Sequence, residues 1–148
     1  MTKNARLKLV SRVRDARRRL RDAVAGDLAV AEAEHVAADE RRSEAAADVD
    51  EVKATVVDRL TEARTVRTLW TFEHEHRVAV SQLSDAERAV KAALEESDRQ
   101  RARLAARARE LKTAEKVVDR TRTGIQHDER RAEQRSNDDL AGRTRRDD

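Results

Sequence analysis

Small and apolar residues recur along the chain at alternating steps of three and four, the pattern of a helix that buries one stripe of side chains. A first series of such positions runs from Leu9 to Leu60, and a second runs from Leu69 to Ile125. Spacings that average close to 3.5 residues favour a left-handed coiled coil. The pattern therefore predicts two long helices that pack against each other through these stripes.

Each predicted stripe contains mainly alanine, valine and leucine, with Arg42 standing where one further member of the first stripe is due. The first stripe consists of Leu9, Val13, Ala16, Leu20, Val24, Leu28, Ala31, His35, Ala38, Ala45, Val49, Val52, Val56 and Leu60. The second consists of Leu69, Phe72, His76, Ala79, Leu83, Ala86, Val90, Ala93, Ser97, Arg101, Leu104, Ala108, Leu111, Ala114, Val118 and Ile125.

The stripe loses its phase in residues 61–68, TEARTVRT, where threonines accumulate. Threonine is a poor helix former but can cap a helix, so this segment is the predicted turn. The spacing of Ser84 and Glu87 resembles a capping box, but the stripe continues through it, which places it inside the second helix. The sequence thus predicts an all-α fold, a long antiparallel two-helix coiled-coil hairpin forming one domain over residues 1–148. Its predicted parts are a helix over 3–60, a tip over 61–68, a helix over 69–138 and a polar tail over 139–148.

Composition agrees with this prediction. Ala, Glu, Lys, Leu and Arg make up 85 of the 148 residues, and there are three glycines and no proline. Such a composition is typical of long helices and atypical of disordered linkers. The chain has no cysteine, and its longest stretch free of charged residues spans seven residues, far below the ~20 needed to cross a bilayer. With no apolar segment at the N-terminus, we expect a cytoplasmic protein without direct membrane insertion.

Charge is unevenly distributed. Residues 1–24 carry a net charge of +7, residues 27–62 carry −7 and residues 99–122 carry +6. In the predicted hairpin, residue i lies opposite roughly residue 130 − i, so both basic segments gather at the end that carries the termini. Like charges on adjacent helices cost stability, which an acidic partner would recover. The basic end is therefore interpreted as a binding surface, with an ordinary solvated coiled-coil face as the alternative.

The segment LWTFEHEHRVAV, residues 69–80, contains both aromatic residues and two of the four histidines. His74 and His76 are about 200° apart on a helix, so they cannot bind one metal ion. No nucleophile–base pair or glycine-rich phosphate loop occurs, so we expect neither a cofactor nor enzyme activity. Phe72 is expected in the stripe, and Trp70, one position away from it, is expected to be partly exposed as a contact for a partner.

The chain resembles the FliJ/YscO family of type III secretion stalk proteins. The resemblance rests on the opening RLKLVSRVRDARRRLRDAVAGDLAVAEAE, the aromatic cluster after the turn and the closing ERRAEQRSNDDLA. It implies a non-enzymatic protein, peripheral to the inner-membrane export apparatus of a flagellum or injectisome. Its implied partners are a hexameric export ATPase, the cytoplasmic domain of the export-gate membrane protein and secretion chaperones.

The family enters the ATPase ring with the end of the hairpin that carries the termini. The gate-facing tyrosines of the family have no counterpart here, since the chain has no tyrosine. By resemblance, Leu69, Trp70 and Phe72 contact the gate. The implied ATPase-binding residues are Arg12, Arg14, Arg17, Arg18, Arg19, Arg21, Arg103, Arg107, Arg109, Lys112 and Lys116.

Two other functions stay open at the level of sequence. A basic rod that binds nucleic acid is favoured by the high isoelectric point of about 9.7. The 30 acidic residues and the scarcity of aromatic residues for base stacking disfavour it, so no nucleic-acid partner is expected. A structural coiled coil that dimerises through unbroken helices is the second alternative, and its mass in solution would be twice 16.8 kDa.

Overall fold

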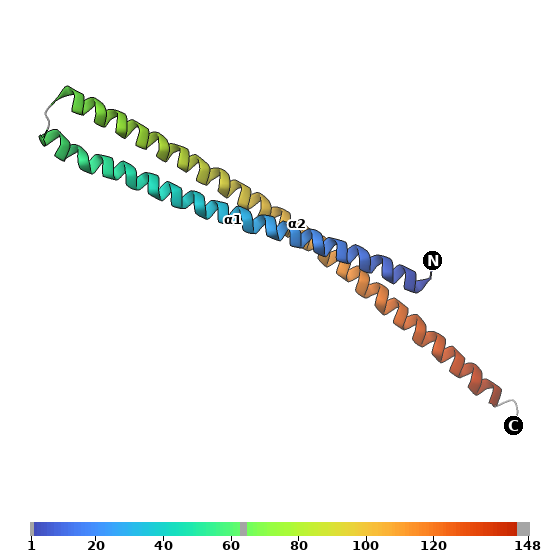
Figure 1. Cartoon of the computed structure of the whole chain (residues 1–148). Coiled ribbons are helices and arrows are strands. Elements are labelled where there is room, and N and C mark those ends of the chain that lie inside the picture. The colour runs from blue at the N-terminus through green and yellow to red at the C-terminus, as the bar shows by residue number, and fades with distance from the viewer. Residues whose placement is uncertain (1, 63–64, 145–148) are drawn as a thin grey trace. The chain divides into compact units, whose positions relative to one another are not determined.

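The computed structural model describes residues 2–62 and 65–144. In these residues the chain forms two α-helices, α1 (Lys3–Glu62) and α2 (Val66–Thr144), and no strand (Figure 1). The two helices pack against each other in antiparallel directions. This arrangement confirms the predicted all-α helical hairpin. None of the described helices contains a stretch long and apolar enough to span a membrane.

A threonine precedes each helix and caps it. The Ala5 amide donates to Thr2 Oγ1 at 3.3 Å at the start of α1, and the Thr68 amide lies 3.4 Å from Thr65 Oγ1 at the start of α2. Such side-chain acceptors satisfy amides that have no partner inside the first turn. Of the predicted turn, residues 63 and 64 lie outside the described residues. Residues 61–62 belong to α1 and residues 66–68 to α2, which corrects the predicted tip of 61–68.

The predicted end of the second helix is also corrected, because α2 continues to Thr144 instead of ending at residue 138. All side chains from residue 126 to residue 138 are exposed, so this part of α2 lacks an apolar stripe. Its sequence, rich in Ala, Glu, Gln and Arg and free of proline, has high intrinsic helix propensity. Propensity thus maintains the helix beyond the end of the apolar stripe, and α2 continues into the first residues of the predicted tail.

Ion pairs between the helices fix their register. Lys3 pairs with Asp128 at 2.8 Å, Arg17 with Glu110 at 2.7 Å and Arg59 with Glu75 at 2.7 Å. Each pair lies within four residues of the predicted relation between i and 130 − i.

The chain divides into two compact units, where the sequence predicted one domain. Unit 1 consists of Met1–Ala23 and Ala105–Asp148, and unit 2 consists of Val24–Leu104. Each unit contains one piece of α1 and one piece of α2. The boundaries between the units fall where the residues that face the opposite helix change from mostly small and aliphatic in unit 2 to arginine-rich in unit 1.

In unit 2 the row of residues that faces the opposite helix, called the seam below, matches the predicted stripe closely. The fully buried residues are mostly small: Ala31, Ala38, Val49, Ala79 and Ser97, with Gln100 as the one long side chain. Small residues bury little area each, so this seam stabilises the unit through many modest contacts. The half-buried seam residues of α1 here are Val24, Leu28, His35, Arg42, Ala45, Val52 and Val56. Those of α2 are Phe72, His76, Leu83, Ala86, Val90, Ala93 and Leu104.

In unit 1 the predicted stripe of α1 is wrong. Leu9, Val13 and Leu20 are 53%, 45% and 49% exposed, and Ala16 is exposed as well. The half-buried seam positions are Leu7, Val10, Arg14, Arg17 and Arg21. The predicted path required three successive steps of four from Ala16 to Leu28, which would locally distort the supercoil. The helix instead keeps its regular alternation of three and four and brings arginines into the seam.

The regular alternation of three and four also corrects the predicted stripe of α2. Arg101 and Ala108 are exposed, and the seam passes through Gln100 and Arg107 one position earlier. Leu69, the first predicted member of that stripe, is 50% exposed. The fully buried residues of unit 1, within the described range, all belong to α2: Leu111, Ala114 and Val118.

Candidate protein-binding surfaces

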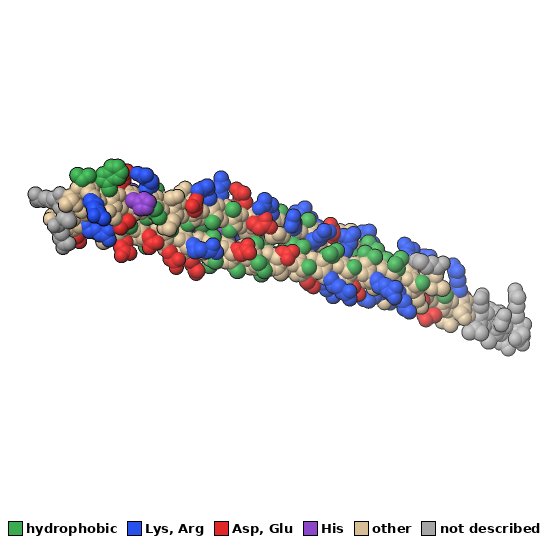
Figure 2. Space-filling model, turned by 45° about the horizontal axis from the view of Figure 1, so that its top comes forward, with side chains coloured by type: hydrophobic (Ala, Val, Ile, Leu, Met, Phe, Trp, Pro, Cys, Tyr) green, Lys and Arg blue, Asp and Glu red, His purple; other side chains and the backbone are tan. Residues whose placement is uncertain are grey.

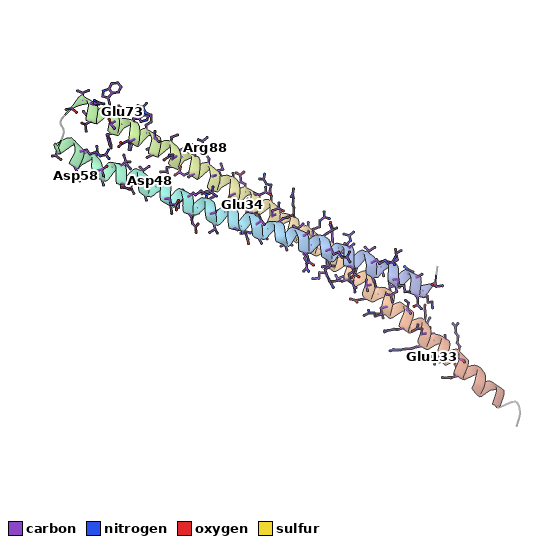
Figure 3. All side chains as sticks on the ribbon, viewed as in Figure 1. Glu34, Asp48, Asp58, Glu73, Arg88 and Glu133 are labelled. Carbon is purple, nitrogen blue, oxygen red and sulfur yellow. The ribbon has the colours of Figure 1, made fainter. Side chains whose placement is uncertain are left out.

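The two units carry opposite net charges. Counted over their sequences, unit 1 has a net charge of +9 and unit 2 a net charge of −6. On the face drawn in Figure 2, Lys and Arg side chains lie beside apolar ones at the end that carries the C-terminus. In unit 2, Glu34, Asp48 and Asp58, labelled in Figure 3, lie along α1 with exposed side chains. The basic end predicted from the sequence is thus a property of unit 1.

Four of the arginines assigned to ATPase binding occupy the seam of unit 1: Arg14, Arg17, Arg21 and Arg107. Arg14 donates to its neighbour Asp15 at 2.7 Å, and Arg21 pairs with Asp22 at 2.5 Å. A guanidinium can cover apolar surface with its methylene stem while its charged end reaches water. These side chains are therefore partly structural and not fully available to a partner.

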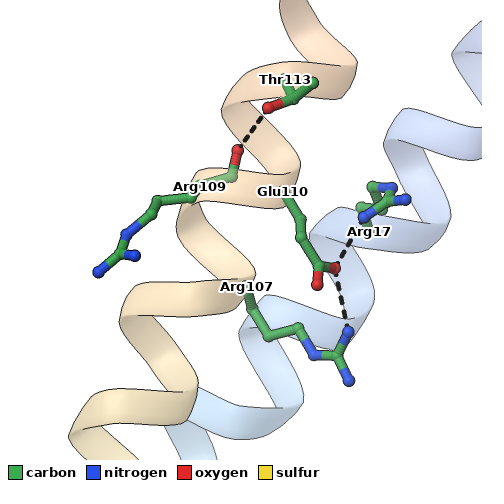
Figure 4. Close-up of polar contacts among 5 residues, drawn as sticks. All are labelled: Arg17, Arg107, Arg109, Glu110 and Thr113. Carbon is green, nitrogen blue, oxygen red and sulfur yellow. Dashed lines mark hydrogen bonds and ion pairs between the residues drawn. The ribbon is translucent and has the colours of Figure 1, made fainter.

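Glu110 forms ion pairs with two of these seam arginines. One of its carboxylate oxygens accepts from Arg17 of α1 at 2.7 Å and from Arg107 of α2 at 3.0 Å (Figure 4). A single carboxylate thus bridges two guanidiniums that would otherwise repel each other across the seam. The sequence analysis did not identify Glu110. The three–four spacing continued from unit 2 places both Arg17 and Arg107 in the seam, and Glu110 lies three residues after Arg107.

Five of the predicted cations are exposed and take no part in any ion pair among the described residues: Arg12, Arg19, Arg109, Lys112 and Lys116. Arg18 is also exposed and lies 3.6 Å from Glu115. Arg103 is exposed but belongs to unit 2. The cations that are available to an acidic partner are therefore a subset of the predicted list.

An apolar groove runs along one side of unit 1. It has a volume of about 360 Å³ and is lined by Val10, Val13, Arg17, Glu110, Thr113, Ala114 and Val117. Val117 of α2 is 44% exposed, similar to Val13 across the groove. This surface was not predicted, because the apolar pattern placed Val13, which lines the groove, and its neighbours Leu9 and Leu20 in the interior.

The aromatic cluster lies at the start of α2 in unit 2. Trp70 is 69% exposed, as predicted for a residue outside the seam, and Phe72 is half-buried in the seam as predicted. The Phe72 and His76 rings stack with centroids 5.7 Å apart, while His74 is exposed. Leu69 and Trp70 therefore form an exposed apolar tip at the start of α2, while Phe72 and His76 belong to the seam.

Metal binding finds no geometric support at this cluster. Across the described part of the chain, no group of three or more His, Asp or Glu side chains is arranged to hold a metal ion. The space beside Trp70 is lined by Glu73, His74 and Arg77, and Arg77 pairs with Glu73 at 2.7 Å.

Among the described residues, three groups have clearly shifted pKa values, and each takes part in a polar contact. The hydrogen bond from Lys3 lowers the pKa of Asp128, and the hydrogen bond from Gln100 lowers the pKa of Glu96. The hydrogen bond with Glu32 raises the pKa of Arg101. All three shifts favour the charged form; the contacts of Asp128 and Arg101 join the two helices, while that of Glu96 lies within α2.

No known protein family matches the chain, and neither a curated protein nor a solved structure shows significant similarity to it.

Proposed function

We propose that this chain is a non-enzymatic rod that binds an acidic protein surface with unit 1. Following the family resemblance, that surface belongs to the hexameric ATPase of a bacterial type III export apparatus, and the chain is its central stalk. The proposal rests on Arg12, Arg19, Arg109, Lys112 and Lys116. These five cations are exposed, take no part in any ion pair among the described residues, and belong to a unit with a net charge of +9. An acidic partner would neutralise this charge and relieve the repulsion within unit 1.

In the same proposal, the exposed tip of unit 2 contacts the export gate and engages chaperones. Leu69 and Trp70 are large, exposed apolar side chains, and tryptophan is enriched among the residues that dominate binding energy at interfaces. Trp70 is the only tryptophan in the chain. Its fluorescence therefore reports directly on this contact: emission should shift to shorter wavelength when the cytoplasmic domain of the gate is added.

The ATPase role is tested by measuring ATP hydrolysis by the export ATPase from the same genome, with and without this protein. Wild type should stimulate hydrolysis, and a variant with Arg12→Glu and Arg19→Glu should not. A matched control changes Arg67→Glu and Lys91→Glu, two exposed cations of unit 2 without ion pairs among the described residues. The control has the same net charge as the variant and should stimulate like wild type. Absence of stimulation by wild type would contradict the proposal.

A nucleic-acid role is the alternative that the charge of unit 1 favours. It predicts binding to duplex DNA with an affinity that falls steeply as salt rises, because each phosphate contact releases counterions. DNA binding by wild type that is lost in Arg12→Glu/Arg19→Glu, together with no effect on the ATPase, would favour this alternative over the export stalk.

A further inference from the structure

Unit 1 presents a continuous apolar stripe that the hairpin itself leaves uncovered. Leu9, Val13, Ala16 and Leu20 follow one another at steps of four, three and four, so they share one face of α1. All four side chains are exposed. Across the groove, α2 contributes Val117 and Thr113. Two helices that leave such a face open resemble a three-helix bundle with one helix missing.

Basic residues border this stripe on both outer sides. Arg12 and Arg19 each lie three residues after a stripe member of α1, Leu9 and Ala16. On α2, Lys116 lies three residues after Thr113 of the groove, and Arg109 lies four residues before it. Residues three or four apart on a helix are surface neighbours. These four cations are exposed, and none is engaged in an ion pair within the described range.

The two acidic residues of α1 in unit 1 are directed away from the stripe. Asp15 and Asp22 each lie two residues, or about 200°, after a stripe member, which places them on the opposite side of α1. Glu110 lines the groove but is already engaged by Arg17 and Arg107. The groove therefore has an apolar floor between two basic rims.

We infer that this groove binds one amphipathic helix with acidic flanks, supplied by a partner protein. An apolar floor takes leucine, isoleucine or valine side chains spaced by three and four, and the rims pair with Asp or Glu beside them. From Leu9 to Leu20 the stripe covers eleven residue-to-residue steps, about 16 Å at 1.5 Å per step, so three to four helical turns cover it. The inference deepens the proposed function by naming the chemistry of one partner of unit 1.

A second copy of the chain is a poorer occupant. Two copies meeting groove to groove would bring four basic rims together and repel each other. The acidic part of α1, residues 27–62, already uses its apolar seam against α2 within unit 2. A nucleic acid would satisfy the rims but leave the apolar floor unmatched.

The test is fluorescence anisotropy of the full-length protein with a labelled 18-residue peptide that has leucines at heptad spacing and glutamates on both flanks. Two peptide controls are a scrambled version of the same composition and a version with lysine in place of every glutamate. The stripe variant is Val13→Gln with Leu20→Gln. The matched protein control is Val30→Gln with Val36→Gln, exposed valines of unit 2 that are 59% and 57% accessible. Circular dichroism checks that each variant keeps its helix content.

The expected result is binding of the acidic amphipathic peptide alone, with a dissociation constant at least about tenfold higher for the stripe variant and unchanged for the control. Equal binding of the scrambled peptide, equal affinity of the stripe variant, or no binding at about 100 μM protein would overturn the inference. A wild-type mass of twice 16.8 kDa that returns to 16.8 kDa in the stripe variant would make a second copy the occupant. If the stripe variant still stimulates ATP hydrolysis by the export ATPase, the inference about the groove fails and the proposed function stands. If Arg12→Glu/Arg19→Glu stimulates ATP hydrolysis normally while peptide binding holds, the proposed function fails and the inference stands.

Discussion

Units 1 and 2 are built from the same two helices in the same heptad register, yet they fill that register differently. In unit 2 both helices place mostly small and aliphatic residues in the seam, with His35, Arg42 and Gln100 among the exceptions. In unit 1 the fully buried residues come from α2, while α1 brings Arg14, Arg17 and Arg21 to face them. Leu9, Val13 and Leu20 of α1 lie beside the seam instead.

This difference shows how a coiled coil can separate packing from binding. A seam filled with apolar residues on both sides, as in unit 2, consumes its apolar surface in holding the helices together. In unit 1, the methylene stems of the seam arginines take the place of apolar side chains between the helices. Leu9, Val13 and Leu20 are therefore left exposed and available to another helix. Unit 2 is therefore the better candidate for a rigid scaffold, and unit 1 for a docking end.

The largest expected effect distinguishes a seam residue from a stripe residue within unit 1. Leu111 is 7% exposed and Leu20 is 49% exposed. Leu111→Ala should lower the free energy of unfolding by about 2–3 kcal/mol, because it removes buried methylenes and leaves a cavity. Leu20→Ala should cost less than about 1 kcal/mol. Urea unfolding followed by circular dichroism measures both, and equal losses would mean that Leu20 also packs inside.

Unit 2 contains a polar exception whose removal should stabilise it. Gln100 is buried and donates to Glu96 at 2.7 Å, but its Oε1 has no hydrogen-bond partner among the described residues. Gln100→Leu should raise the free energy of unfolding by about 1 kcal/mol, since an unsatisfied buried acceptor is removed. Gln82→Leu, at an exposed position, is the control and should change it by less than about 0.5 kcal/mol. Destabilisation by Gln100→Leu would show that this amide is needed for the register.

In unit 1, Glu110→Gln should release the repulsion between Arg17 and Arg107. All three side chains are about 40% exposed, so the free energy of unfolding should fall by about 0.5–1 kcal/mol at low salt. This fall should be smaller in 1 M salt, where charges more than about 3 Å apart are screened. Glu115→Gln, which removes one longer contact at 3.6 Å to Arg18, is the matched control with a smaller effect. Identical salt dependence of the two variants would contradict the bridging role of Glu110.

The smallest expected effect concerns the ends of unit 1. The hydrogen bond from Lys3 lowers the pKa of Asp128 below its ordinary value of 3.8. A carboxyl group whose pKa is lower in the folded state contributes stability above its unfolded pKa and loses it as the pH falls through the folded value. Lys3→Gln should therefore raise the pKa of Asp128 toward 3.8, as read from an NMR titration of its carboxyl carbon. Lys8→Gln, at an exposed and unpaired position within the described range, should leave it unchanged.

How far the sequence alone predicts this molecule also differs between the units. From Val24 to Val56 apolar residues occupy every heptad position except those of His35 and Arg42, so spacing alone identifies the seam. In unit 1 the heptad positions hold arginines, and a search for apolar residues moves one position away, to Val13 and Leu20. What excludes Val13 and Leu20 from the seam is the continuity of α1, because an unbroken helix continues the three–four spacing of unit 2 into unit 1.

The candidate surfaces follow the same division. Charge counts placed the basic end correctly, and the position of Trp70 beside the apolar stripe predicted its exposure correctly. They could not separate the free Arg12 and Arg19 from the arginines that Asp15, Asp22 and Glu110 engage, because that separation depends on which face of α1 meets α2. The groove was missed for the same reason.

Thiol labelling tests the central claim, an open apolar stripe beside an arginine-filled seam, most directly. The chain has no cysteine, so single substitutions Leu20→Cys and Ala114→Cys introduce one reactive group each. The account predicts that the thiol at position 20 reacts in the native protein at least about tenfold faster than the thiol at position 114, which is protected until the helices separate. Equal protection at both positions would show that Leu20 is buried in the seam, and the proposed docking surface would not exist.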